Sequence, residues 1–244
     1  MNRIDYIVNW IEEYANTNQR KSLVVGISGG IDSAVVSTLC AKTNLPTHCL
    51  TMPITQISAQ HNLSMRHGKW LSEQFSNVEH HIMPLDEVYK EFKTMFTPTF
   101  QTEHAFANTK SRLRMVTLHQ ISGSSDGIVV GTGNKVEDFG VGFYTKYGDG
   151  GVDISPIADC TKTEVWDIAK DLDIIQDIID APPTDGLWED GRTDKDQLGG
   201  LTYEQLEEAM TNKDSEHYED YIKLRKPNLH KMEPIPVCSM EKYR

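Results

Sequence analysis

The chain has 244 residues, of which 38% are hydrophobic and 25% charged, and its formal net charge is −12. This length allows one sizeable α/β domain or at most two small ones. The strong negative charge argues against a non-specific nucleic-acid-binding protein, because a phosphate backbone requires a basic face. The sequence has neither a charged-then-apolar leader at Met1 nor an apolar run of about 18 residues, so it predicts neither secretion nor a membrane span.

The cysteines are widely scattered along the chain. They are Cys40, Cys49, Cys160 and Cys238, and none forms a C-x-x-C pair with another. This spacing argues against a zinc knuckle or a redox pair. Small buried thiols in a reducing compartment are the simpler interpretation, and we expect a cytoplasmic protein.

The elements predicted along the chain alternate between helix and strand. Apolar residues at helical spacing, among them Ile4, Ile7 and Ile11, predict an amphipathic N-terminal helix. The predicted strands are Ser22–Ile27, Thr47–Met52, Val78–Met83 and Gly127–Gly131. The predicted helices between them are Ser33–Lys42, a long helix from Ser58, Leu85–Phe96 and Glu103–Ser122. This alternation predicts an α/β fold, one Rossmann-like domain over residues 1–244, with an open parallel sheet and helices on both faces.

Sheets of this kind bind ligands beyond the carboxyl ends of their strands. The functional loops should therefore follow Ile27, Met52 and Val130, and the chain is chemically richest after the first and the last of these.

The loop after the first strand is a Ser-Gly-Gly turn followed by an Asp-Ser pair. Its glycines let backbone N–H groups approach phosphate oxygens, and the following helix directs its positive end at the anion. Asp32 would repel phosphate unless a cation intervened, so we expect it to hold a Mg²⁺ ion that bridges the phosphates. The alternative is an ordinary tight turn in which Asp32 caps a helix.

This S-G-G-x-D-S turn resembles the pyrophosphate loop of the N-type ATP pyrophosphatases, which cleave ATP between its α and β phosphates. Those enzymes transfer AMP rather than the γ-phosphate, which accounts for the missing Walker A lysine. The resemblance implies ATP binding by Gly26, Ile27, Ser28, Gly29, Gly30, Ile31, Asp32 and Ser33.

Two later motifs are similar to those of NAD synthetases in particular. The first is N-x-K-x-R-x-R-M, which contains Arg112 and Arg114. Because these arginines lie two apart on a helix, they could bind two separate anionic groups, or one could contact a neighbouring subunit. The second is G-T-x-N-x-x-E, followed by F-Y-T-K-Y-G-D-G-G-x-D over residues 143–153. Its Glu137 offers a second oxygen ligand for Mg²⁺, although in isolation it would pass for a surface carboxylate.

The C-terminal part carries three further points of resemblance. Residues 159–165 resemble a helix start whose lysine, Lys162, contacts ATP phosphate. Residues 181–200 are rich in Gly, Pro and Asp, which predicts either a disordered insert or a lid, and they resemble the mobile loop of NAD synthetases. His230 and Lys231 match a substrate-binding pair, whereas Met232 replaces an arginine that is common in the family.

The resemblance implies amidation of deamido-NAD with ammonia and ATP, through an acyl-adenylate, by a homodimer. The site residues that it implies are Asp32 and Lys146 for catalysis, Asp32 and Glu137 for Mg²⁺, Thr132, Lys162 and Thr184 for ATP, and Arg112, Lys146, Asp153, His230 and Lys231 for deamido-NAD. A short segment precedes the loop, so we expect no glutaminase domain and free ammonia as donor. The N-terminal helix and the 103–122 helix are the expected dimer contacts.

Two other functions stay open on the sequence. One is an enzyme of the same superfamily that amidates or thiolates a nucleobase or tRNA. The other is a non-catalytic adenine-nucleotide sensor, which the presence of both Asp32 and Glu137 argues against.

Overall fold

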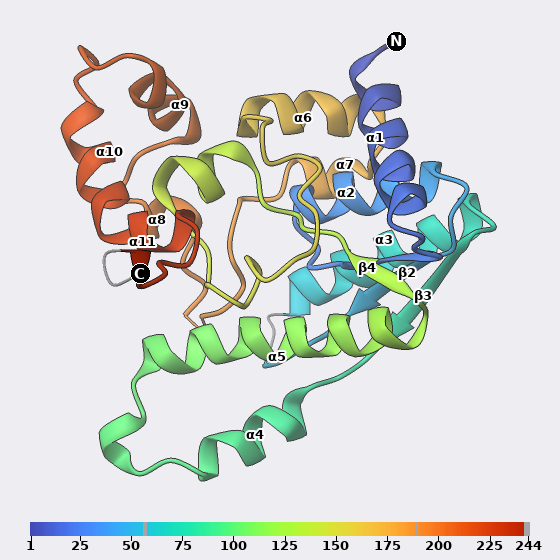
Figure 1. Cartoon of the computed structure of the whole chain (residues 1–244), viewed down its shortest axis with the longest axis horizontal. Coiled ribbons are helices and arrows are strands. Elements are labelled where there is room, and N and C mark those ends of the chain that lie inside the picture. The colour runs from blue at the N-terminus through green and yellow to red at the C-terminus, as the bar shows by residue number, and fades with distance from the viewer. Residues whose placement is uncertain (56–57, 189, 242–244) are drawn as a thin grey trace.

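The computed structural model describes residues 1–55, 58–188 and 190–241 (Figure 1). Within these residues, the centre of the fold is a parallel sheet of four strands in the order β3-β2-β1-β4. The strands are β1 (Ser22–Gly26), β2 (Thr47–Thr51), β3 (Val78–Ile82) and β4 (Gly127–Val129). Each lies within its predicted range and ends one or two residues earlier, so the predicted α/β fold with an open parallel sheet is confirmed.

Helices cover both faces of this sheet, as Figure 1 shows. The α-helices are α1 (Arg3–Thr17), α2 (Ile31–Lys42), α3 (Ser58–Gln74), α4 (Asp86–Thr94), α5 (Glu103–Ser124), α6 (Lys162–Asp171), α7 (Gln176–Ile179), α8 (Asp194–Gln197), α9 (Tyr203–Thr211), α10 (Tyr218–Arg225) and α11 (Leu229–Met232). Two short 3-10 helices, η1 (Pro98–Phe100) and η3 (Lys226–Asn228), and a π-helix, η2 (Lys135–Val141), complete the elements. Among the described helices, none is long and apolar enough to cross a membrane.

Alternate strand residues point into two hydrophobic cores. Leu23 and Val25 of β1 pack in the first core with α1, α2, α3 and α6. Val24 and Leu50 pack in the second core with residues of α4 and α5. In β1 and β4, residues that point to opposite faces are both buried, which is the reason these two strands read as apolar runs.

A third hydrophobic cluster lies in the C-terminal part, where α9 and α10 pack against η2. Arg225 of α10 donates hydrogen bonds to the carbonyls of Phe139 and Gly140 in η2. The cluster therefore fixes the C-terminal helices against the segment that follows β4.

The boundaries of the first helices differ little from the predictions. The N-terminal helix is confirmed, with Ile7, Val8 and Ile11 buried in the first core. The helix after the Ser-Gly-Gly turn begins at Ile31, two residues before the predicted Ser33, so that Asp32 lies in its first turn.

Candidate active site

The Ser-Gly-Gly turn joins the carboxyl end of β1 directly to α2. Gly29 has a φ of +93°, and a Cβ atom there would lie 2.5 Å from the carbonyl oxygen of Gln60, so no larger residue fits. The Ser33 hydroxyl donates to the carbonyl of Gly30 at 2.9 Å and lies 3.0 Å from that of Ser28. These contacts hold a curved loop at a helix N-terminus, which is a favourable place for a phosphate.

Three charged side chains converge next to this loop. Lys162, the first residue of α6, places its Nζ atom 2.5 Å from Oδ2 of Asp32 and 3.0 Å from Oε1 of Glu137. Lys162 is only 2% exposed. Because β1 and β4 are neighbours in the sheet, the loops after them bring Asp32 and Glu137 together.

Asn134 connects the two loops. Its side-chain oxygen accepts hydrogen bonds from the backbone N–H groups of Val136 and Glu137, which caps η2. Its amide nitrogen donates to Oδ1 of Asp32 at 3.0 Å. One fully buried side chain thus orients both carboxylates, a role that its position in the motif did not reveal.

The environment of the cluster keeps the lysine charged. Burial would lower the pKa of Lys162, but Asp32 and Glu137 outweigh this effect and raise it. Burial also favours protonation of Glu137, yet Lys162 and Tyr203 outweigh it and lower the pKa of that carboxyl. For Asp32, burial is the largest effect and raises the pKa, with Lys162 opposing it. The cluster has one more carboxyl group than ammonium groups.

Tyr203 and Asp194 are also part of this site, although the sequence had given neither of them a role. The Tyr203 hydroxyl donates to Glu137 at 2.7 Å and to Asp194 at 2.9 Å. Since the hydroxyl has a single proton, it can serve only one carboxylate at a time. Burial and the nearby Glu137 raise the pKa of Asp194 to about 7, which favours its protonated form. Capping boxes at Thr193 and Thr202 account for the two helix starts in the structure, but they do not explain this contact.

The 181–200 segment folds against the rest of the chain in its described part. The Trp188 indole donates to Gln197 at 2.8 Å, and the Lys110 ammonium donates to the carbonyl of Leu187 at 3.0 Å. Asp194, in α8, is buried. These contacts hold the described residues of the segment against α5 and α8.

A second group of predicted residues gathers near the C-terminal helices. The Lys146 ammonium donates to the carbonyl of His230 at 3.2 Å, and Arg112 donates to the carbonyl of Lys146 at 3.3 Å. Lys231 donates to the carbonyl of Tyr144 at 2.7 Å and lies 4.9 Å from the centre of its ring. Burial lowers the pKa of Lys231. The structure thus brings together Arg112, Lys146, His230 and Lys231, which come from three distant stretches of sequence.

The remaining predicted residues make local contacts. Oδ2 of Asp153 accepts a hydrogen bond from the backbone N–H of Val129 at 2.7 Å, at the end of β4. The Thr184 hydroxyl donates to the carbonyl of Arg192 within the 181–200 segment. Thr132 is half-buried between β4 and η2.

Comparison with known proteins identifies the family. The profile of the NAD synthase family matches residues 3–242 of the chain. The chain belongs to the NAD synthase family. The NH(3)-dependent NAD(+) synthetase of Carboxydothermus hydrogenoformans is 36% identical over 234 residues, which cover 94% of this chain and 93% of that protein.

Solved structures agree with this placement in the NAD synthase family. An NMN synthetase from Francisella tularensis is 30% identical, with a TM-score of 0.88 and 97% of both chains covered. An NH3-dependent NAD synthetase from Campylobacter jejuni is 26% identical, with a TM-score of 0.76 and 97% of both chains covered. The resemblance to NH3-dependent NAD synthetases is therefore confirmed, as is the prediction of a ligase of NAD biosynthesis that binds ATP.

The charged cluster of this NAD synthase family member fits a Mg²⁺ ion. Mg²⁺ in nucleotide sites is bound by one or two carboxylates together with substrate phosphates. Asp32 and Glu137 supply such oxygens from a buried position, and they share a single ammonium. The resulting excess of negative charge favours a further cation. The residues that could hold it are Asp32 and Glu137, the pair expected from the sequence.

Proposed function

We propose that this chain amidates the nicotinate carboxylate of deamido-NAD with ammonia at the expense of ATP. A carboxylate does not react with ammonia near neutral pH, because oxide is a very poor leaving group. Activation must therefore come first. The carboxylate oxygen attacks the α-phosphorus of ATP, pyrophosphate leaves, and ammonia then displaces AMP from the acyl-adenylate.

The observation that carries the proposal is the buried cluster of Asp32, Lys162 and Glu137 beside the Ser-Gly-Gly loop. The loop residues 26–33 and Lys162 would bind the triphosphate, and Thr132 and Thr184 would hold the nucleotide. When bound by Asp32 and Glu137, Mg²⁺ would neutralise charge on the phosphates. Positioning and electrostatics can carry the step without a covalent nucleophile.

The deamido-NAD side of the site would be formed by the second group. Arg112, Lys146, His230 and Lys231 supply positive charge for a substrate with a pyrophosphate and a carboxylate, and Asp153 lies at the neighbouring strand end. Lys146 is the proposed catalytic cation of this group. Its ammonium donates to the neutral carbonyl of His230 and lies 5.7 Å from the centre of the Tyr147 ring, so turning to an anion would break no ion pair within the described part of the chain.

Nicotinate mononucleotide is the second candidate for the carboxylate substrate. The observation that favours it is the structural similarity to the Francisella NMN synthetase, with a TM-score of 0.88 against 0.76 for the Campylobacter NAD synthetase. The 36% identity with an NAD(+) synthetase favours deamido-NAD. Both acceptors have the same nicotinate carboxylate, so the amidation chemistry is the same for both. The contacts that the protein makes with the second nucleotide of deamido-NAD would decide which acceptor is preferred.

The test is a product assay with Mg-ATP, ammonium or glutamine, and either acceptor. We expect NAD and AMP in equal amounts from deamido-NAD with ammonium, and a higher kcat/KM than with nicotinate mononucleotide. A higher kcat/KM with nicotinate mononucleotide would identify that compound as the substrate. Formation of ADP, or no consumption of either acceptor, would overturn the proposal.

Asp32→Asn should abolish turnover while the protein stays folded, whereas Lys146→Ala should lower kcat far more than it raises KM for ATP.

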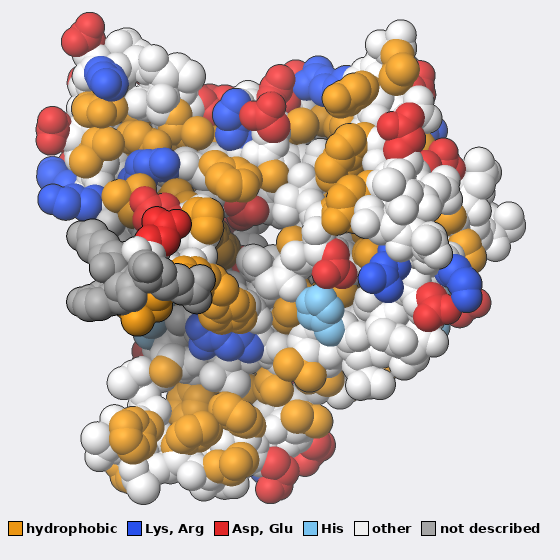
Figure 2. Space-filling view, viewed as in Figure 1, with side chains coloured by type: hydrophobic (Ala, Val, Ile, Leu, Met, Phe, Trp, Pro, Cys, Tyr) orange, Lys and Arg blue, Asp and Glu red, His pale blue; other side chains and the backbone are white. Residues whose placement is uncertain are grey.

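We further propose a homodimer that uses the α4–α5 side of the molecule. Figure 2 shows hydrophobic side chains gathered over this end. Met95 is 75% exposed and Phe100 67% exposed, and they line a groove of about 600 Å³. An apolar patch of this kind is typical of an interaction surface. Light scattering after gel filtration should give the mass of a dimer for the parent protein and that of a monomer for the double variant Met95→Asp, Phe100→Asp. The variant Tyr6→Asp tests the contact expected at α1, and a monomer there would assign α1 to the interface.

A further inference from the structure

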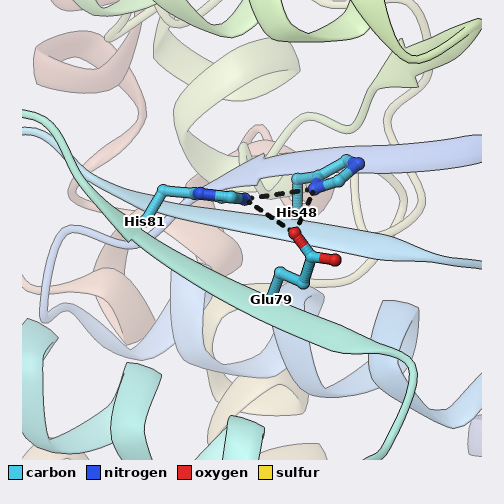
Figure 3. A group of neighbouring side chains, drawn as sticks. All are labelled: His48, Glu79 and His81. Carbon is cyan, nitrogen blue, oxygen red and sulfur yellow. Dashed lines mark hydrogen bonds and ion pairs between the residues drawn. The ribbon is translucent and has the colours of Figure 1, made fainter.

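A compact group of ligand-type side chains lies on the sheet, in strands that carry none of the active-site residues above. It consists of His48 on β2 and of Glu79 and His81 on β3 (Figure 3). His48 is paired with Glu79 in the parallel register, and His81 lies two residues after Glu79. Side chains alternate along a strand, so all three project from the same face of the sheet.

The three ligand atoms form a nearly regular triangle. Nδ1 of His48 lies 3.1 Å from Nε2 of His81 and 3.7 Å from Oε2 of Glu79. Nε2 of His81 and Oε2 of Glu79 are 3.6 Å apart. Tetrahedral Zn²⁺ with bonds of about 2.0–2.2 Å places neighbouring ligand atoms roughly 3.3–3.6 Å apart. The triangle therefore matches one face of a coordination tetrahedron without rearrangement of the strands.

The face that carries this triangle is partly open. α5 packs mainly on β1 and β4, whereas α3 covers β2 and β3 from the opposite face. The side chains of His48 and His81 are 19% and 34% exposed, and that of Glu79 is 71% exposed. An ion can therefore enter from solvent, and water can supply the remaining ligand.

The donor chemistry selects the kind of ion. Two imidazoles and one carboxylate suit Zn²⁺ and its first-row neighbours, whereas Mg²⁺ prefers oxygen ligands alone. The hydrogen bond between the two rings needs one proton, which can move to the other nitrogen of its own ring when the ion binds.

We propose that His48, Glu79 and His81 bind one Zn²⁺ ion, or a similar first-row divalent ion, at a site separate from the ATP site. Such an ion would connect β3, the edge strand of the sheet, to β2. Because the unfolded chain does not hold the three ligands together, binding would stabilise the folded state in proportion to the logarithm of ion concentration.

The test uses Co²⁺ and Zn²⁺ as probes of the full chain after chelator treatment, in a Cys238→Ser background that removes an exposed thiol. We expect one equivalent of Co²⁺ with the visible absorption of a tetrahedral site, displaced by Zn²⁺, and a higher Tm with Zn²⁺. The matched variants are His48→Ala, His81→Ala and the control His217→Ala, a histidine that lies 3.6 Å from a single glutamate, Glu216.

The outcomes separate the proposal from non-specific binding. His48→Ala and His81→Ala should each weaken Zn²⁺ binding by at least about tenfold and remove the Tm shift, while His217→Ala leaves both unchanged. Unchanged binding in His48→Ala and His81→Ala would overturn the proposal. So would binding by the parent protein that saturates only at millimolar Zn²⁺.

Discussion

Lys162 and Asp32 form a buried ion pair in which Nζ and Oδ2 lie 2.5 Å apart. The same ammonium lies 3.0 Å from Glu137, so one positive charge serves two carboxylates. Charges removed from water cost free energy unless they are paired and hydrogen-bonded. A cation that binds Asp32 and Glu137 should therefore also increase the stability of the fold.

Replacing Lys162 with Met should destabilise the protein in a way that Mg²⁺ reverses. Without the ammonium, the carboxylates of Asp32 and Glu137 face each other, and we expect a loss of about 3–5 kcal/mol in the free energy of unfolding in chelated buffer. Urea unfolding in EDTA and in Mg²⁺ measures the free energy of unfolding under each condition. Lys170→Met, at an exposed lysine of the same helix, is the control. An equal loss in both buffers would mean that the carboxylates do not hold the ion.

Tyr203→Phe should loosen the 181–200 segment. The variant lacks the hydroxyl that contacts both Glu137 and Asp194, and a lost buried hydrogen bond costs about 1–3 kcal/mol. We expect faster cleavage within residues 181–200 in limited proteolysis and a higher KM for ATP. Tyr218→Phe on α10 is the control. Unchanged cleavage and KM would show that this hydroxyl does not hold the segment.

Gly29→Ala and Gly123→Ala should have opposite effects on stability. At Gly29 the φ of +93° and the 2.5 Å approach to the Gln60 carbonyl both disfavour a Cβ atom, so we expect a loss of about 2 kcal/mol or more and weaker ATP binding. Gly123 lies inside α5 with no atom within 4 Å of the added Cβ, so alanine should stabilise by about 0.5–1 kcal/mol. Thermal unfolding measures the stability of each variant, and nucleotide titration measures its ATP affinity. A Gly29→Ala protein with normal ATP affinity would contradict the assignment of the Ser-Gly-Gly loop to phosphate binding.

His67 should make the protein sensitive to acid. Burial lowers the pKa of His67 from 6.5 to about 4, while the unfolded chain titrates near its ordinary value. Between these values the unfolded state binds more protons, so stability falls as the pH falls through this window. The effect is about 3 kcal/mol at its full extent. Its Nε2 atom lies 2.9 Å from the Ser37 hydroxyl, a contact that His67→Gln can retain.

The measurement for His67 is the unfolding free energy of the parent and of His67→Gln at several pH values. We expect the parent to lose more stability than the variant on acidification from pH 6.5 to pH 4. Other histidines titrate in both proteins, so the difference between the two curves isolates His67. Parallel curves would contradict a buried, neutral imidazole.

Local patterns were sufficient for the strands of this protein and for the helices of its first half, whereas the short helices after α6 were not predicted. The four strands, the amphipathic N-terminal helix and the Ser-Gly-Gly turn were predicted to within a few residues, because apolar periodicity and glycine act over short stretches. The helix start at Lys162 followed from the motif, and its capping box of Thr161 and Glu164 accounts for it physically. The contacts of residues 181–200 were beyond these patterns, since composition does not report what a polar segment packs against.

The sequence by itself determined the fold class, the family and the chemical types available: a phosphate loop, two carboxylates for a cation and a set of basic residues. Only the tertiary structure decided which of them meet. Asp32 contacts Asn134 and Lys162, which are 102 and 130 residues away along the chain. The order β3-β2-β1-β4 brings the loops after β1 and β4 together, and the pairing of β2 with β3 does the same for His48 and His81. Such contacts depend on strand order and register, which short-range periodicity does not encode.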